Sequence, residues 1–489
     1  MPASARHLIV VLLGATCVVP SALSQPAPAP ASGAITLTGS LRARAESWDW
    51  FGPQREGEYA FGGVLARLGI GQRFARISWQ VDAAAVALSG LPDDAALPAP
   101  QGQLGFGASY FVANGGDETP VGLFVKQAFV RIGSTPGTGR DLSIRLGRFE
   151  FGDGSEVTPR QATAAAVKAQ RVNQRLIGTF GFSHVGRSFD GVHLAVDRPA
   201  LNFTTIAALP TRGAFDVDGM SSLDVRLLYT GFTRPFAWRG GSGEWRAFGV
   251  AYIDRRGGAV RADNRPLAIR QADRGDLDLA TLGAHFLQVV PTRAGEFDLL
   301  LWGVFQQGDW GALEHESSAA AAELGWQPPR TLLRPWLRIG VSEGKGDDDP
   351  DDSRHGTFFQ VLPTARVFAR FPFYNMMNTR DAFASLLLRP APVSIRLDAR
   401  VIALEEATDL WYAGSGAFER ETFGYAGRPG GGRDELATLL DASIEVRPRR
   451  WITLTAYGAV ARGGDVVRSV YGDDQPDARL FYLEAEVRR

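Results

Sequence analysis

The chain has 489 residues, 45% of them hydrophobic, and its 52 basic and 53 acidic side chains leave a formal net charge of −1 at pH 7. Three of the basic residues are lysines, the rest are arginines, and the chain has one cysteine. A single cysteine excludes disulfides within the chain, and the lack of a long apolar run after residue 24 excludes a protein that crosses a membrane with helices.

Residues 1–24 have the pattern of a signal peptide. A short basic region precedes the apolar residues 8–19 (LIVVLLGATCVV), and small residues suit cleavage before Gln25. Residues 25–32 (QPAPAPAS) are predicted to be a flexible leader. Because Cys17 lies inside the signal, the exported chain would have no thiol and no cysteine-based metal or redox chemistry.

From residue 33 onward, apolar and polar side chains alternate, as they do first and most clearly in 35–46. A period of two places Ile35 and Leu37 on one face of a strand and Arg42 and Arg44 on the other. Soluble strands average about five or six residues. The longer runs seen here favour tilted strands that cross a membrane, with apolar side chains toward lipid and polar ones toward water.

Eighteen segments of residues 33–489 are predicted as strands: 33–50, 58–71, 74–89, 121–133, 141–152, 187–197, 200–210, 220–233, 244–255, 276–290, 294–308, 315–326, 332–344, 375–389, 392–405, 433–447, 450–462 and 478–488. The links between them alternate between short turns and long segments such as 90–120 and 153–186. Outer-membrane barrels sort their connections in this way. The sequence therefore predicts an all-β, transmembrane antiparallel barrel of about eighteen strands, with short periplasmic turns and long extracellular loops.

Aromatic residues gather near the predicted strand ends. They are Trp48, Trp50, Phe51, Trp302, Trp310, Trp326, Trp336, Trp451, Phe481 and Tyr482. Amphipathic rings are enriched at headgroup level in membrane proteins, so these residues are interpreted as interfacial girdles.

The predicted inner face carries the candidate solute-binding residues. They are Arg42, Arg44, Arg76, Arg226, Arg338, Arg396 and Arg400, with Asp82 and Asp398. Two interpretations stay open. The arginines form a ladder that binds carboxylates through bidentate hydrogen bonds, or they pair with acids such as Asp224 and Glu445 and hold the wall together. A slip of one residue in any strand would turn its arginine outward.

Other polar clusters give weaker signals. The acidic run 347–352 either binds calcium or is a solvated loop, and it lacks the glycine and closing glutamate of an EF-hand. After the predicted signal peptide, five histidines are scattered singly: His184, His193, His285, His315 and His355. No nucleophile elbow or paired-histidine motif is present, so we expect no enzyme activity and no cofactor.

Six segments occur in a characteristic order and spacing: QAFV (127–130), LGRFEFGDG (146–154), RSFDGV (187–192), QGDWG (307–311), GKGDDDPDD (344–352) and TFFQVLPT (357–364). On these segments the chain resembles the alginate export family of outer-membrane barrels. The resemblance implies an eighteen-stranded monomeric channel with an arginine-rich constriction that conducts an acidic polysaccharide.

In one respect the chain departs from that family. Alginate exporters are expected to carry a long periplasmic turn before the penultimate strand, and only 447–450 is available here. The longest predicted periplasmic link is instead 233–243. We therefore keep the barrel as the expected fold and leave the solute open.

The function expected from the sequence is passage of an anionic, uronate-bearing oligo- or polysaccharide through the lumen. The alternatives are a porin for other small polar or organic-acid solutes, and a structural or adhesion barrel blocked by its loops 90–120 and 153–186. The expected partners are outer-membrane lipid and lipopolysaccharide, the solute, and periplasmic export proteins. No nucleic-acid partner is expected, and the expected location is the outer membrane of a Gram-negative bacterium.

Overall fold

The computed structural model describes residues 33–52, 55–133, 141–329, 331–372, 374–474 and 476–489. The predicted signal peptide and leader, 1–24 and 25–32, lie outside the described residues.

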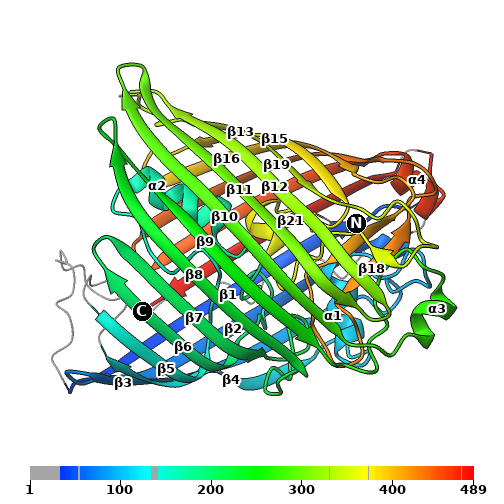
Figure 1. Cartoon of the computed structure of the whole chain (residues 1–489), viewed down its shortest axis with the longest axis horizontal. Coiled ribbons are helices and arrows are strands. Elements are labelled where there is room, and N and C mark those ends of the chain that lie inside the picture. Colours follow the sequence, from blue (N-terminus) through cyan, green and yellow to red (C-terminus); the bar gives the residue numbers. More distant parts are fainter. Residues whose placement is uncertain (1–32, 53–54, 134–140, 330, 373, 475) are drawn as a thin grey trace.

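Eighteen strands of the described chain form a closed antiparallel barrel, as predicted (Figure 1). They are β1 (Ile35–Asp49), β2 (Glu58–Arg73), β3 (Ile77–Ser89), β4 (Val121–Gly133), β5 (Asp141–Phe149), β6 (Phe189–Arg198), β7 (Leu201–Pro210), β8 (Val225–Trp238), β9 (Gly241–Asp254), β10 (Leu277–Thr292), β11 (Gly295–Trp310), β12 (Leu313–Gln327), β13 (Trp336–Gly344), β15 (Thr379–Leu388), β16 (Val393–Leu404), β19 (Glu435–Arg449), β20 (Ile452–Gly463) and β21 (Asp477–Arg488). Each strand pairs with its neighbour in sequence, and β1 pairs with β21 from Ser40↔Arg488 to Asp49↔Arg479. This last pairing closes the barrel and removes its open edges.

The remaining elements of the described chain are short and belong to the loops. They are η3 (Arg55–Gly57), α1 (Phe106–Ala113), α2 (Ala162–Val167), η4 (Lys168–Val172), α3 (Leu267–Ala272), β14 (Arg354–His355), η5 (Ala365–Val367), β17 (Leu410–Gly414), β18 (Tyr425–Pro429) and α4 (Asp465–Tyr471). None of the described helices is long and apolar enough to cross a membrane.

The outer face of the barrel shows why the alternation predicts the strands. Leu37, Leu68 and Leu123 are 74%, 73% and 76% exposed, whereas Arg44 and Glu46 on the opposite face of β1 are buried. Only a lipid environment makes such a band of exposed apolar side chains favourable. The backbone groups are satisfied within the closed sheet, as a membrane strand requires.

The short turns lie at one rim and most of the long loops at the other (Figure 1). The prediction of a long periplasmic link at 233–243 is wrong. Strands β8 and β9 extend into this segment and leave a two-residue turn at Arg239 and Gly240. Both residues have positive φ, 50° and 73°, which suits the tight turn of a twisted hairpin. One described connection at the extracellular rim is an exception to this sorting, because only residues 311–312 join β11 to β12.

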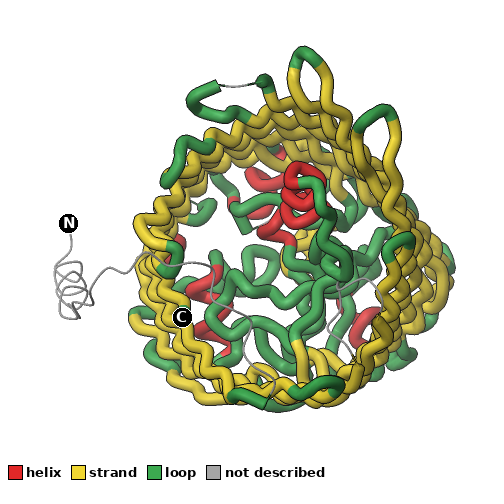
Figure 2. The backbone as a smooth tube through the Cα atoms, turned by 90° about the vertical axis from the view of Figure 1, so that its left-hand side faces the viewer, coloured by secondary structure: helices red, strands yellow, loops and turns green. Residues whose placement is uncertain are grey.

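Extracellular loops fold into the barrel and fill much of its interior (Figure 2). Their apolar side chains and inward-facing strand residues form one large hydrophobic cluster and a smaller one around α2. The prediction of aromatic girdles is therefore largely wrong: most of the rings near strand ends are buried against the loops, namely Trp48, Trp50, Phe51, Trp302, Trp310, Trp336 and Tyr482. Trp451 and Phe481 are about half exposed and stay on the outer surface.

Candidate functional site

The 150–188 loop, between β5 and β6, crosses the lumen and is tied to the opposite wall. Arg171 and Arg175 of this loop bind Glu323 of β12 at 2.8 and 3.3 Å. Lys168 binds Glu244 of β9 at 2.6 Å. Each of these five side chains is buried. Because an unpaired buried charge is strongly unfavourable, these contacts fix the path of the loop.

A second segment, the 345–378 loop between β13 and β15, runs beside the first one. Ile177 and Leu362 form a parallel bridge, and the Gly178 amide donates to the Leu362 carbonyl at 2.8 Å. The guanidinium of Arg187 donates to the carbonyls of Gly178, Leu362 and Ser415 at 3.1, 2.8 and 3.2 Å. Ser415 belongs to the 405–434 loop between β16 and β19, so three loops form one folded unit inside the barrel.

Two cavities lie on either side of residues 179–186. The periplasmic cavity is about 480 Å³ and is lined by the inner wall of β1–β3 together with Thr179, Gly181 and Ser183. The extracellular cavity is about 460 Å³ and is lined by the loops, including Phe180 and Arg366. Residues 179–186 therefore form the waist of the lumen.

Phe182 lies at this waist between two arginines. The guanidinium carbons of Arg44 and Arg366 are 3.7 and 3.5 Å from the centroid of its ring. Two guanidinium groups do not fit on one face of a ring at these distances, so Phe182 is sandwiched between them. Arg44 comes from the wall and Arg366 from η5, so this contact joins wall and loops by cation–π attraction.

Arg42 supports the waist from the periplasmic side. Its guanidinium donates to the carbonyls of Gly181 and Ser183 at 2.7 and 2.5 Å. The Glu484 carboxylate lies 3.9 Å away, a loose ion pair. Arg42 thus binds carbonyl oxygens more closely than it binds an acid.

The structure places most of the predicted set on the inner wall and pairs it with acids. Arg44 binds Glu46 and Glu484, Arg338 binds Asp298 and Glu323, Arg396 binds Asp398, and Arg400 binds Asp381. Asp82 accepts hydrogen bonds from Gln127 and Gln80 at 2.8 and 2.9 Å. These contacts join the residues into the inner wall of the barrel, although Asp224 is exposed and Glu445 pairs with Arg447.

Two predicted arginines are not on the inner wall. Arg226 and its neighbour Asp224 are exposed, because Val225, Leu227 and Tyr229 of the same stretch are buried and face inward. The ring centroids of Tyr229 and Phe151 are 5.3 Å apart, so the 150–188 loop packs on this part of β8 and makes the inner face apolar.

Arg76 lies in the turn between β2 and β3 and is exposed at the periplasmic rim.

Arg366 and Arg370 also lie in the lumen, but the sequence pattern does not predict this position for either of them. Arg366 is 6% exposed, and none of its three nitrogens has a hydrogen-bond partner among the described residues. Burial lowers the pKa of the Arg366 guanidinium to about 10. Alternation gives no signal for these residues, since they lie in a loop, in the apolar segment TARVFARF (364–371).

The other polar clusters are structural. His315 and His355 were expected to be isolated, but they form a pair. Their Nδ1 atoms are 2.9 Å apart, and the His355 ring stacks on Trp310. Asp347 of the acidic run accepts from the amides of Asp349 and Gly356 and so folds its own loop. Among the described residues, no group of three or more acids, histidines or cysteines is placed to hold a metal ion.

Solved porins share the fold. The structure matches outer-membrane protein OpdK of Pseudomonas aeruginosa with a TM-score of 0.54 and 9% identity, over 93% of this chain and 99% of that one. A BenF-like porin of Pseudomonas fluorescens Pf-5 gives 0.56 and 8% over the same shares. OccAB2 of Acinetobacter baumannii gives 0.53 and 9%, over 92% of this chain and 98% of that one. No curated protein sequence matches the chain.

The family model described as alginate export matches residues 123–480, more than two thirds of the chain. The matched region runs from β4 to β21 and contains every loop of the waist. Together with the closed eighteen-strand barrel, this match shows a channel of the Gram-negative outer membrane, and the chain belongs to the alginate export family.

Proposed function

We propose that the lumen conducts small solutes that carry a carboxylate, and that the arginines at the waist select them. The observation that supports this proposal is Arg366, a buried guanidinium without a hydrogen-bond partner among the described residues. Arg42 lies on the periplasmic side of the same constriction and has only a loose ion pair with Glu484 at 3.9 Å, so it adds positive charge there, whereas Arg44 is paired with Glu46 and Glu484.

The chemistry of these groups favours carboxylates. A guanidinium offers parallel N–H groups that match the two oxygens of a carboxylate, and such charge-assisted bonds are stronger in a narrow, partly dry lumen. The paired arginines Arg338, Arg396 and Arg400, with Asp82 and Asp398, have a different role in this proposal. They keep the wall and loops in place around the waist.

A uronate-bearing saccharide is the second candidate solute, and the family match favours it. Uronates carry the same carboxylate group. The two cavities, about 480 and 460 Å³, suit a single small solute on each side of the waist. A polymer would require residues 179–186 to move aside.

Planar-bilayer recordings test the proposal. Purified protein should give anion-selective currents, and Arg366→Gln should lower the ratio of anion to cation permeability by about twofold or more. Arg226→Gln is the matched control, because this arginine is exposed on the outer face of β8 and should leave the ratio unchanged. Cation-selective currents, or no current, would contradict the channel proposed here.

The same recordings separate the two solutes. Glucuronate should carry current through the open channel, and a polyuronate should at most block it. Current carried by the polymer itself would favour the saccharide exporter instead.

A further inference from the structure

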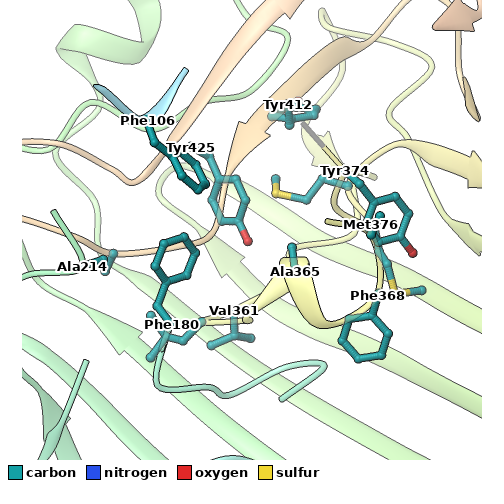
Figure 3. Close-up of a cluster of buried hydrophobic side chains, with 14 of the residues drawn as sticks. Phe106, Phe180, Ala214, Val361, Ala365, Phe368, Tyr374, Met376, Tyr412 and Tyr425 are labelled. Carbon is teal, nitrogen blue, oxygen red and sulfur yellow. The ribbon is translucent and has the colours of Figure 1, made fainter. Parts of the chain in front are cut away.

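The extracellular cavity is walled by aromatic rings from four separate loops. Phe106 comes from α1, Phe180 from the 150–188 loop, Phe215 from the 211–224 loop and Phe418 from the 405–434 loop. The ring centroids of Phe215 lie 5.2, 5.5 and 5.4 Å from those of Phe106, Phe180 and Phe418. Figure 3 labels Phe106, Phe180 and Tyr425, all of which line the cavity.

These rings are a built feature of the fold. Each of the four loops contributes at least one phenylalanine to the same cluster, although the loops are separate in sequence. Edge-to-face packing of this kind holds aromatic side chains in fixed positions. The cavity therefore has a preformed apolar wall into which another flat ring fits.

Arg366 lines the same cavity and supplies its unsatisfied charge. One face of its guanidinium lies on Phe182, 3.5 Å from the ring centroid, and Phe106 lies at 5.2 Å. Its Nε, Nη1 and Nη2 atoms have no hydrogen-bond partner among the described residues. Aromatic contacts offset only part of what it costs to take a guanidinium out of water. An anion that enters the cavity would supply the missing partner.

The charge of the lining also favours an anion. Two arginines, Arg366 and Arg428, and one acid, Glu419, are found among the residues that line the cavity. Arg428 donates to the Gln101 carbonyl at 2.9 Å and stacks on Trp411, and of its nitrogens Nη1 alone lacks a hydrogen-bond partner among the described residues. Arg366 lacks a partner at all three nitrogens, so it has the larger unmet hydrogen-bonding capacity of the two cations.

We infer that the extracellular cavity is a binding site for a small aromatic carboxylate, whose carboxylate pairs with Arg366 and whose ring packs among Phe106, Phe180, Phe215 and Phe418. This inference rests on the proposed function, since it names the class of carboxylate that the channel accepts from outside. A saccharide fits this wall less well, because its hydroxyl groups would face aromatic rings instead of hydrogen-bond partners.

Calorimetry on the detergent-purified full chain tests the site with three probes: benzoate, cyclohexanecarboxylate and glucuronate. Benzoate should bind most tightly, with cyclohexanecarboxylate about two- to tenfold weaker, since aromatic pairing is lost while charge and size are kept. Equal binding of all three probes, or tighter binding of glucuronate, would overturn the inference.

Variants locate the site. Arg366→Gln should weaken benzoate binding by about ten- to hundredfold, the range expected for a charge-assisted hydrogen bond. Phe215→Leu keeps Arg366 and should reduce the preference for benzoate over cyclohexanecarboxylate. Arg226→Gln should leave binding unchanged. If Arg366→Gln does not give a folded barrel, the loss of aromatic preference in Phe215→Leu decides the matter on its own.

Ion currents test the proposed channel and benzoate binding tests the aromatic site, so the two proposals can fail separately. Anion-selective currents without benzoate binding would overturn the aromatic site and leave the carboxylate channel standing. Benzoate binding without anion-selective current would support the site and contradict the channel.

Discussion

At the scale of single residues, the inner wall is held by buried ion pairs rather than by a free ladder of arginines. Arg338 and Arg400 each contact a buried acid, Asp298 and Asp381, and Arg400 also donates to the Phe368 carbonyl at 2.8 Å. Replacing one partner leaves the other charged and buried, which destabilises more strongly than losing the pair as a whole.

Arg400→Ser should therefore destabilise the protein, since Asp381 loses its cation and the 345–378 loop loses an anchor. The expected decrease in the free energy of unfolding is about 3–5 kcal/mol. Urea denaturation in detergent, followed by the heat-modifiable mobility of the barrel on gels, measures it.

Arg226→Ser is the control for this change. Its side chain is exposed on the outer face of β8, so its free energy of unfolding should stay within about 0.5 kcal/mol of the wild type. If the control lost as much stability as Arg400→Ser, the loss in Arg400→Ser could not be attributed to the buried, inward position of Arg400.

At the scale of elements, the sequence predicts the strands well and the loops poorly. All eighteen predicted strands are present, because each must show lipid an apolar face over its whole length. The inner face obeys no such rule. At β8 the loop packs against the wall, so Leu227 and Tyr229 face inward and Arg226 faces outward. The kind of residue that faces the lumen therefore depends on contacts with the loops, which cannot be deduced from the sequence of one strand.

The candidate site was predictable only in part for the same reason. Arg42 and Arg44 follow the alternation of β1, which turns them inward, and the path of the loops brings the waist to them. Arg366 depends on the path of the 345–378 loop, which is fixed by backbone pairing to residues 174–178. Such pairing between distant loops leaves no periodic pattern in the sequence.

Glu323 of β12 is the element-level anchor of the 150–188 loop, because it contacts Arg171, Arg175 and Arg338. Glu323→Gln should release the loop while the barrel stays closed, since β12 keeps its backbone pairing to both neighbours. Single-channel currents should then fluctuate more often and have a larger mean conductance than those of the wild type.

Glu343→Gln is the matched control for that variant. Glu343 lies on the outer face of β13, and its side chain is 47% exposed. Its currents should match the wild type. Quiet wild-type-like currents from Glu323→Gln would show that the loop is held without this acid.

At the scale of the whole molecule, a rigid closed wall surrounds a second folded body, made of the three loops in the lumen (Figure 2). A barrel conducts past such a body in one of two ways: the loops stay together and the solute moves along their surface, or the loops separate. The parallel bridge between Ile177 and Leu362 and the Arg187 contacts to three carbonyls favour the first way. Both bridge residues are fully buried, so their separation would expose apolar surface inside the pore.

A disulfide across this bridge tests the choice. Bridge partners lie within the Cα separation that a disulfide accepts, about 4.4–6.8 Å, and the chain has no cysteine after Cys17 to interfere. In Ile177→Cys with Leu362→Cys, oxidation should leave the single-channel conductance and the anion preference as they are in the same protein after reduction. A drop in conductance on oxidation, reversed by reductant, would show instead that the two loops part during conduction. Solutes would then cross the barrel between the loops, and the waist at Phe182 would be a moving constriction rather than a fixed one.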